Sequence, residues 1–334
     1  MTQFFAAAGI KNPHLQTLLP RFIRKKALFT PVWQTLDTPD GDFLDLAWSQ
    51  QPDSEAAHNK PIFVLFHGLE GCFYSPYANG LMNAFSKSGW LSVMMHFRGC
   101  SGKPNKKARA YHSGEVTDAR FFLEQLNQQF PNNPKVAVGI SLGGNMLANY
   151  LAEYKDDPVL SAATIVSAHW TWQHVQIVLS SFSKVYRRYL LSSLKRNALQ
   201  KHDLIHGELA LSYNSIKRVT RLYEFDDLIT APLHGFKDAQ DYYDQCSGLS
   251  KLQQITLPTL IIHAKDDPFM TEEVIPKFVL PDNIDYRLYE HGGHVGFLTG
   301  SALKPKFWLE EALPAYYESI AAEYLSAVSV PRTQ

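Results

Sequence analysis

The feature that most constrains the fold is a serine between two glycines, in the run Gly139-Ile140-Ser141-Leu142-Gly143. An apolar, strand-like run, 135–140, comes directly before Ser141, and a helix-like run, 142–154, follows it. Because the chain must pass close to itself at such a junction, small glycines are needed on both sides. The pattern predicts a sharp strand-to-helix turn that presents the Ser141 hydroxyl at the edge of a sheet. The alternative is a glycine-rich turn that merely contains a serine.

A regular alternation of strand-like and helix-like segments surrounds this turn. Strand-like runs lie at 62–66, 90–97, 135–140, 160–167, 259–264 and 286–289, and helix-like runs at 76–86, 114–128, 142–154 and 308–325. Near-continuous apolar strands that alternate with helices predict a parallel sheet covered on both faces. We therefore expect an α/β fold whose ligands bind at the carboxyl ends of the strands.

Two segments depart from this alternation. The first thirty residues have no regular pattern, and the strand-like runs 32–35 and 43–48, joined by a turn, predict a hairpin. From 169 to 251 the sequence is helix-like and lacks strands, which indicates a helical cap inserted between two strands of the sheet. The predicted division is a core made of 1–168 and 252–334, with the cap at 169–251.

Composition narrows the classes of protein to consider. The 32 basic and 32 acidic residues give a formal net charge of zero, which argues against a general nucleic-acid binder. Three scattered cysteines, Cys72, Cys100 and Cys246, are too few for a disulfide framework and are expected to be reduced thiols. No run reaches the ~20 apolar residues that a membrane-spanning helix needs, and the N-terminus lacks the positive start of a signal peptide. We expect a cytoplasmic protein.

Two side chains, each placed after a strand-like run, could form a nucleophilic site with Ser141. A serine hydroxyl needs an adjacent base, and that base needs a carboxylate to orient it. Asp267, just before Pro268, is the candidate acid, with Asp266 as the alternative. His294, on the glycine-rich loop after the next strand, is the candidate base, with His291 as the alternative.

Backbone N–H groups are expected to stabilise an oxyanion beside the serine. One belongs to Leu142, and the other to Leu69 in the run His67-Gly68-Leu69-Glu70-Gly71, which follows an earlier strand. We interpret His67 as a structural residue that holds this loop.

A metal site is the competing interpretation of the same region. It would draw together His263, Asp266, Asp267, His291 and His294. No close ligand pair such as H-E-x-x-H is present, and Ser141 would have no role in it. We therefore predict neither a metal nor a cofactor.

Together these motifs resemble the α/β-hydrolase superfamily, and more narrowly the branch called AB hydrolase family 4. The resemblance covers almost the whole chain through the runs Asn12-Pro13-His14-Leu15-Gln16-Thr17, 67–71, 97–102, 139–145, 224–227, 230–236 and Gly292-Gly293-His294. The branch includes bacterial esterases, yeast medium-chain ester synthase/esterases and mammalian abhydrolase-domain lipases. The resemblance implies an α/β-hydrolase fold and a carboxylic ester hydrolase with the triad Ser141, Asp267 and His294.

The expected function is a serine esterase that acts on short- to medium-chain acyl esters through an acyl-enzyme. An acyltransferase or a glycerolipid lipase with the same triad is the alternative, and a non-catalytic binding protein is the third hypothesis. The partner is then a small ester, which could be a lipid; the oligomeric state is not predicted.

The predicted cap is rich in basic residues between 184 and 201. They are Lys184, Arg187, Arg188, Lys195, Arg196 and Lys201. They form either a surface that makes transient contact with anionic lipid or, as we favour, an ordinary helix with its charges in water. The acids Glu224, Asp226 and Asp227 are expected to brace the cap against the core by pairing with arginine.

Overall fold

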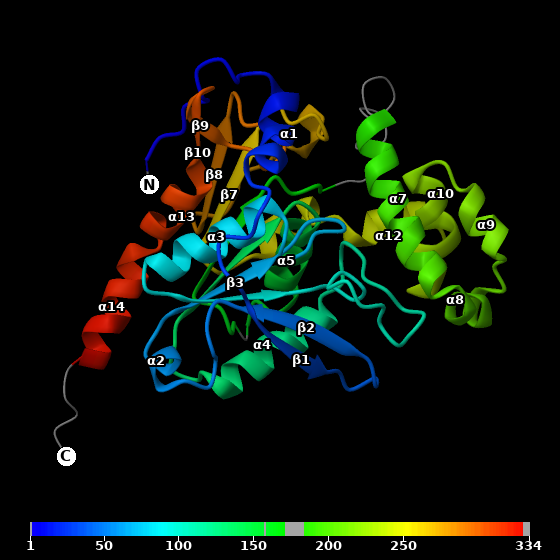
Figure 1. The fold of residues 1–334 in the computed structure, drawn as a ribbon, viewed down its shortest axis with the longest axis horizontal. Coiled ribbons are helices and arrows are strands. Elements are labelled where there is room, and N and C mark those ends of the chain that lie inside the picture. The colour runs from blue at the N-terminus through cyan, green and yellow to red at the C-terminus, as the bar shows by residue number, and fades with distance from the viewer. Residues whose placement is uncertain (1, 157, 171–183, 330–334) are drawn as a thin grey trace.

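The structure is a computed structural model that describes residues 2–156, 158–170 and 184–329, with the backbone alone at 184–189 and 327–329. Eight strands form one sheet in the order β1-β2-β4-β3-β5-β6-β7-β8 (Figure 1). They are β1 (Val32–Asp37), β2 (Phe43–Trp48), β3 (Ile62–Phe66), β4 (Leu91–Met95), β5 (Lys135–Ile140), β6 (Ala162–Val166), β7 (Thr259–Ala264) and β8 (Ile284–Tyr289). The pairs from β4 through β8 are parallel, whereas β1 and β2 pair antiparallel. The predicted α/β fold and the predicted hairpin are confirmed.

Helices cover both faces of the sheet because side chains alternate between the faces along each strand. In β3, Val64 and Phe66 pack on the face covered by α4 (Thr117–Gln129) and α5 (Leu142–Glu153). Phe63 and Leu65 pack on the opposite face, against α3 (Pro76–Lys87) and α13 (Trp308–Tyr316). Every residue of β3 through β7 is buried, which explains the near-continuous apolar runs in the sequence.

The helical segment after β6 lies to one side of the sheet, in green to yellow in Figure 1. Its elements are α7 (Lys184–Gln200), α8 (His202–Leu209), α9 (Tyr213–Arg218), α10 (Leu222–Phe225), η1 (Asp226–Thr230), α11 (Ala231–Leu233), α12 (Ala239–Cys246) and η2 (Leu249–Gln254). Between 184 and 258, where every residue is described, the chain forms no strand. The division into core and cap at 169 and 251 stays a prediction.

The prediction that the first thirty residues are irregular is wrong. Helix α1 spans Pro13–Ile23 and begins at Asn12, whose side chain accepts hydrogen bonds from the backbone N–H groups of His14 (2.9 Å) and Leu15 (3.3 Å). Asn-Pro is also a common turn pair, but here Asn12 is the N-cap and Pro13 occupies the first helical position, where its missing N–H costs nothing.

The C-terminal region also differs from the prediction of one helix at 308–325. It forms two helices, α13 and α14 (Glu318–Ser329), separated at Tyr317. Pro314 lies inside α13 and cannot donate a backbone hydrogen bond to continue the helix. A small hairpin of β9 (Leu298–Ser301) and β10 (Lys304–Phe307), and the short helices α2 (Glu55–His58) and η3 (Glu272–Val274), complete the elements.

A substitution at Gly143 tests how tightly α5 packs against the sheet. A Cβ at this position would lie 2.5 Å from the carbonyl oxygen of Phe66, so the backbone itself would have to move. We expect Gly143→Ala to lower the free energy of unfolding by about 1–3 kcal/mol or more, measured by urea denaturation. Gly207→Ala is the matched control, because nothing lies within 4 Å of the added carbon and α8 should gain helix propensity. Equal stabilities of the two variants would contradict this account of the turn.

Candidate active site

Ser141 occupies a strained turn between β5 and α5. Its φ of 56° and ψ of −116° are rare for a residue with a side chain. The Ser141 N–H donates to the carbonyl of Val166 on the neighbouring strand at 2.8 Å. A Cβ on Gly139 would lie 2.5 Å from the carbonyl oxygen of Gly143, so both glycines are needed for this approach. The turn places Ser141, 7% exposed, in the wall of a cavity at the carboxyl end of β5.

The structure brings Ser141, His294 and Asp267 together. The Oγ of Ser141 lies 3.0 Å from Nε2 of His294, and Nδ1 of His294 lies 2.8 Å from Oδ2 of Asp267. Asp267 is 3% exposed, and its other oxygen accepts the N–H of Phe269 at 2.8 Å. Because a carboxylate only accepts, the hydrogen-bond network assigns the hydrogen of His294 to Nδ1 and leaves a lone pair on Nε2. This arrangement can take the proton of Ser141 as its oxygen attacks.

The alternative acid and base, Asp266 and His291, contact each other and the loop that carries His294. Oδ1 of Asp266 accepts the N–H of Gly293 at 2.9 Å, and its Oδ2 lies 3.2 Å from Nδ1 of His291. The His291 side chain is 42% exposed. Asp266 and His291 therefore pair with each other, beside the pair formed by Asp267 and His294.

Two backbone N–H groups are available beside Ser141. Leu142 begins α5, so its N–H has no acceptor within the helix. A Cβ on Gly68 would lie 3.1 Å from that of Ser141, which places the loop 67–71 against the nucleophile. In this loop the N–H groups of Gly68, Glu70 and Gly71 have acceptors, whereas among the described residues none bonds the N–H of Leu69. Among the described residues, neither N–H of the predicted pair, Leu69 and Leu142, has an acceptor, and their role in binding an oxyanion stays a prediction.

His67 holds this loop, as its interpretation as a structural residue requires. Its Nε2 accepts the N–H of Phe97 at 3.0 Å, and its Nδ1 lies 2.7 Å from the carbonyl oxygen of Gly68. Burial lowers the pKa of His67 to about 3, so the ring is neutral and donates through Nδ1.

Helix α1 makes contacts with the loop of His294 that no local sequence pattern predicts. Thr17 Oγ1 accepts the backbone N–H of His294 at 2.9 Å. Gln16 is fully buried and bonds both the N–H and the carbonyl of Leu298, at 2.6 and 3.1 Å. The loop that carries His294 is therefore held from the N-terminal helix. The run 12–17 is one of the motifs of the sequence, but nothing in the sequence pairs it with residues 294–298.

His169 is the second omission. Its Nδ1 lies 3.0 Å from Oγ of Ser141, and the residue is 4% exposed. In the sequence, position 169 marks only the start of the predicted cap, and a lone histidine gives no local signal of such a contact.

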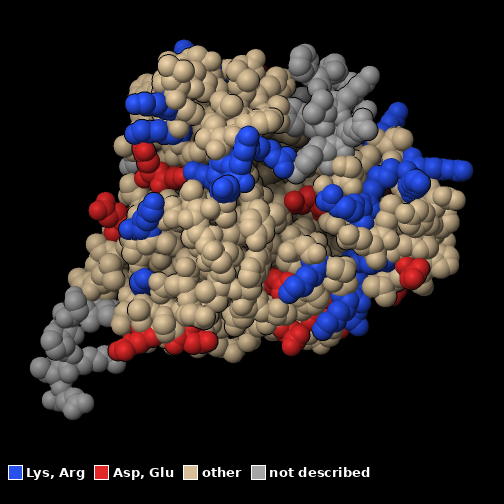
Figure 2. Space-filling view, viewed as in Figure 1, with Lys and Arg blue, Asp and Glu red and all other residues tan. Residues whose placement is uncertain are grey.

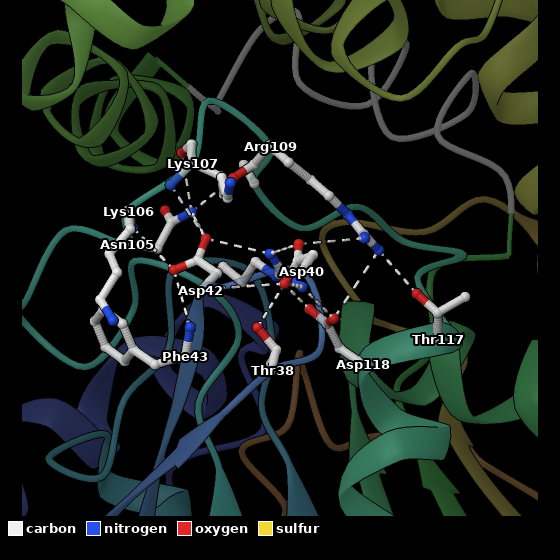
Figure 3. A network of polar contacts seen from close by, with 12 residues as sticks. Thr38, Asp40, Asp42, Phe43, Asn105, Lys106, Lys107, Arg109, Thr117 and Asp118 are labelled. Carbon is white, nitrogen blue, oxygen red and sulfur yellow. Dashed lines mark hydrogen bonds and ion pairs between the residues drawn. The ribbon is translucent and has the colours of Figure 1, made fainter.

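A buried ion network lies beside the site, at the carboxyl end of β4. Arg98 donates to both oxygens of Asp118 at 2.7 Å, to Asp40 at 2.7 Å and to Asp42 at 3.2 Å. Figure 3 shows Asp40 and Asp42, from the turn between β1 and β2, close to Asp118 at the start of α4. Burial alone would lower the pKa of Arg98, but the hydrogen bonds that it donates to Asp118 and Asp40 outweigh burial and raise the pKa. The network fixes the segment that follows β4.

The same network joins the helical segment to the sheet. Asn105 donates to Asp42 at 2.7 Å, and its own side-chain oxygen accepts Nζ of Lys201 at 2.7 Å. Lys201 also donates to the carbonyls of Lys107 and Arg109, at 3.1 and 2.9 Å. Burial lowers the pKa of Lys201 to about 8.

The favoured interpretation of the basic residues, charges in water, is therefore wrong for Lys201. Its ammonium group is buried because three polar oxygens replace the water around it. Lys195 donates to the carbonyls of Lys217 and Val219, both at 2.6 Å. The side chains of Lys184, Arg187 and Arg188 lie outside the described residues.

The expectation that acids 224–227 pair with arginine holds for Glu224, which lies 3.8 Å from Arg221, but Arg221 belongs to the same helical segment, so the expected bracing against the core is wrong. Asp226 accepts hydrogen bonds from Thr230 Oγ1 and the hydroxyl of Tyr243, both at 2.7 Å. Asp227 accepts the N–H of Ala239 at 3.0 Å. These partners all lie within the helical segment, where short-range polar contacts satisfy the acids, and burial raises the pKa of Asp226 to about 6.

A group of possible metal ligands exists elsewhere. Within the described residues, ligand atoms of His112, Glu115 and His234 lie within 4.8 Å of one another. However, Arg109 Nη2 is 2.6 Å from an oxygen of Glu115. This guanidinium occupies the carboxylate and disfavours a cation there.

Comparison with known proteins places the chain in a family. A family model described as the alpha/beta hydrolase fold matches residues 61–301. The chain belongs to the α/β-hydrolase family. The hydrolase is 52% identical over 329 residues to an Escherichia coli (strain K12) protein named "Putative esterase YheT", with 98% of this chain and 95% of the relative covered.

More distant relatives carry more specific names. The hydrolase is 27% identical to mouse phospholipase ABHD3, with 85% of this chain and 71% of the relative covered. It is 30% identical to the Saccharomyces cerevisiae "Medium-chain fatty acid ethyl ester synthase/esterase 2", with 71% and 58% covered. The Pyrococcus furiosus esterase Pf2001 shares the fold, with a TM-score of 0.54, 14% identity and 91% and 92% covered. Across the described residues, no helix is both long and apolar enough to cross a membrane.

Replacing each aspartate in turn tests which one orients His294. We expect Asp267→Asn to lower kcat/KM for p-nitrophenyl butyrate by about 10⁴-fold, because His294 loses the acceptor that fixes its tautomer. Asp266→Asn is the matched control and should stay within about tenfold of the wild type, a loss on the scale of one weakened loop hydrogen bond. A larger loss in Asp266→Asn would reverse the assignment.

Glu70 gives a pH test of the loop beside Ser141. Its carboxyl contacts the hydroxyl of Tyr111 (2.9 Å) and Nδ2 of Asn197 (2.7 Å), and burial raises its pKa to about 7. The raised pKa contributes stability that is complete below the ordinary pKa and lost as pH rises through about 7. Between about pH 5 and 8 the wild type should therefore lose more unfolding free energy than Glu70→Gln. Glu272→Gln, at an exposed site, is the control and should show the same pH dependence of the unfolding free energy as the wild type. Identical pH slopes in the wild type and Glu70→Gln would refute the prediction.

Proposed function

We propose that this hydrolase is a serine carboxylesterase that cleaves short- to medium-chain acyl esters through an acyl-enzyme on Ser141. The observation that carries the proposal is the continuous contact from Asp267 through His294 to Ser141, at 2.8 and 3.0 Å. The esterase name of the E. coli relative at 52% identity supports the same reaction class.

Each residue then has a defined step. Ser141 Oγ attacks the carbonyl carbon while its proton passes to Nε2 of His294, and Asp267 stabilises the resulting imidazolium. The N–H groups of Leu69 and Leu142 stabilise the oxyanion. His294 returns the proton to the departing alcohol, and water then repeats the sequence to release the acid. No cofactor takes part in this scheme.

The cavity at Ser141 supports an apolar acyl group. Leu18, Leu69, Ile140, Phe269 and Val295 line it together with Ser141 and His294. Apolar walls with a few polar groups are typical of sites that bind small apolar substrates. Acidic and basic side chains share the face in Figure 2, in keeping with a neutral substrate rather than nucleic acid.

An alcohol in place of water would make the same site an acyltransferase, and a glycerolipid would make it a lipase. The name of the yeast relative, an ester synthase/esterase, supports the first alternative, and the name of the mouse relative, a phospholipase, supports the second. Ethyl ester formation in ethanol–water mixtures separates transfer from hydrolysis. A non-catalytic binding role would leave the contacts among Ser141, His294 and Asp267 without a purpose. The cytoplasmic location and transient membrane contact stay predictions.

Removal of the proposed nucleophile tests the function. We expect Ser141→Ala to lower kcat for p-nitrophenyl esters by about 10⁴–10⁶-fold, because no other group in the scheme can form the acyl-enzyme. Ser250→Ala, at an exposed position, is the matched control and should keep wild-type rates. A panel of esters from acetate to decanoate then measures the acyl preference. Full activity in Ser141→Ala, or none in the wild type against the whole panel, would reject the proposal.

A further inference from the structure

The Oγ of Ser141 contacts two imidazole rings. Nε2 of His294 and Nδ1 of His169 each lie 3.0 Å from it. The ring centroids of the two histidines are 4.7 Å apart, with an interplanar angle of 61°. The scheme described above uses only His294, so the second contact needs its own explanation.

The number of hydrogens that Ser141 and the two histidines can donate determines which atom is the donor in the contact with His169. A serine hydroxyl has one hydrogen to donate. Asp267 holds the hydrogen of His294 on Nδ1, so the hydroxyl of Ser141 donates to Nε2 of His294. The contact with His169 is then favourable only when Nδ1 of His169 carries a hydrogen and donates it to Oγ. Burial, followed by the neighbouring rings of His294 and His263, holds the pKa of His169 well below its ordinary value, so the ring stays neutral.

The backbone that leads to His169 is held firmly. The N–H of Ser167 donates to the carbonyl of Ile262 at 2.9 Å, and its Oγ accepts the N–H of Val295 at 3.2 Å. Ser167 has a φ of 50°, which turns the chain toward the site. The N–H of Ala168 donates to Nε2 of His263 at 3.1 Å. These bonds tie the end of β6 to β7 and to the loop that carries His294.

Packing fixes the ring as well as the backbone. His169 contacts Phe269 edge-to-face at 5.8 Å between centroids, and Phe269 lies 4.7 Å from His294. His169 also lines the cavity that opens at Ser141. The imidazole therefore lies where substrate reacts and has little freedom to leave.

We propose that His169 is a second catalytic histidine, which donates a hydrogen bond from Nδ1–H to Ser141 Oγ and stabilises the charge on that oxygen as its bond to the acyl carbon forms or breaks. The proposal rests on the proposed function and adds a residue to its mechanism. His294 alone moves the proton, and His169 transfers none.

The bond changes balance without a further reactant. In acylation the Oγ–C bond forms, the carbonyl electron pair moves to the oxyanion, and the Oγ proton passes to His294. The oxyanion pair then returns to the carbonyl, the bond between the acyl carbon and the alcohol oxygen breaks, and His294 gives its proton to the departing alcohol. In deacylation water bonds to the acyl carbon and gives its proton to His294. The C–Oγ bond then breaks, its electron pair goes to Oγ, and His294 returns the proton to Oγ while His169 donates its hydrogen bond.

The two half-reactions should depend on His169 to different degrees. In the free enzyme the hydrogen bond from His169 to Oγ already exists. The transition state of acylation is therefore stabilised only by the extent to which this bond becomes stronger. In the acyl-enzyme Oγ is an ester oxygen, which is a poor acceptor, and the bond forms as charge returns to Oγ. Only interactions that are stronger in the transition state accelerate a step, so deacylation gains more.

Two substitutions separate the hydrogen bond from packing. His169→Asn places an amide nitrogen near the position of Nδ1 and can still donate. His169→Leu has a similar reach but no donor. In stopped-flow measurements with p-nitrophenyl acetate, the burst reports acylation and the later linear phase reports deacylation.

We expect His169→Leu to slow the linear phase by about 10- to 100-fold, the effect of losing a hydrogen bond to a group that gains charge, and to slow the burst less. His169→Asn should recover most of the rate. The pH midpoint of kcat/KM should match that of the wild type in both variants, because His169 takes up no proton. Labelling of Ser141 by a fluorophosphonate, which reports attack alone, should slow only slightly in His169→Leu.

Several results would overturn the proposal. Wild-type rates in both phases of His169→Leu would mean that the ring only packs. Equal losses in His169→Asn and His169→Leu, with a shifted pH midpoint, would make His169 a base. Circular dichroism and Tm establish that each variant is folded. If one is not, His169→Gln, which keeps a donor, replaces His169→Asn, and His169→Met, which has no donor, replaces His169→Leu. A wild type that neither turns over esters nor reacts with fluorophosphonate would instead remove the proposed function itself.

Discussion

The site depends on the backbone turn at Ser141. A residue with a side chain is held at a φ of 56°, a conformation that costs of order 1–3 kcal/mol. The cost is offset because Gly139 and Gly143 allow the helix to approach the strand, and because Ser141 donates its N–H to Val166. As a result, the Ser141 side chain lies at the carboxyl edge of the sheet, and helix α5 begins at the next residue.

The strand order then decides which residues can reach that side chain. β5 lies between β3 and β6, with β7 and β8 beyond β6. Because these strands are parallel, the segments that follow them all emerge at one edge. The loop after β3 supplies Leu69, the end of β6 supplies His169, and the segments after β7 and β8 supply Asp267 and His294. Residues separated by more than 200 positions become neighbours through sheet order alone.

More remote contacts hold these loops in position. Thr17 on α1 fixes the backbone of His294, and Gln16 ties the same helix to Leu298. On the other side, Arg98 pairs with the three carboxylates labelled in Figure 3 and fixes the segment after β4. Lys201 attaches the helical segment to it through Asn105. Buried charge networks of this kind are costly unless every member is paired, so a single substitution should disturb the whole loop.

The sequence predicted what local patterns encode. Buried parallel strands read as apolar runs, and the chain order of Ser141, Asp267 and His294 placed each at a strand end, so the α/β fold and the convergence of these residues could be inferred. Helix α1 could not, because its start depends on an Asn12 side-chain cap that resembles a turn signal. His169 gave no pattern at all, since its role follows from the position of β6 beside β5. The partners of Asp226 and Lys201 likewise depend on tertiary neighbours that spacing does not reveal.

Mass spectrometry of the enzyme stopped by acid during turnover tests the central claim most directly. With a p-nitrophenyl ester in excess and a quench within the burst, one acyl group should be found on the peptide that contains Ser141. Turnover with that peptide unmodified, or with the acyl group on another residue, would contradict the account.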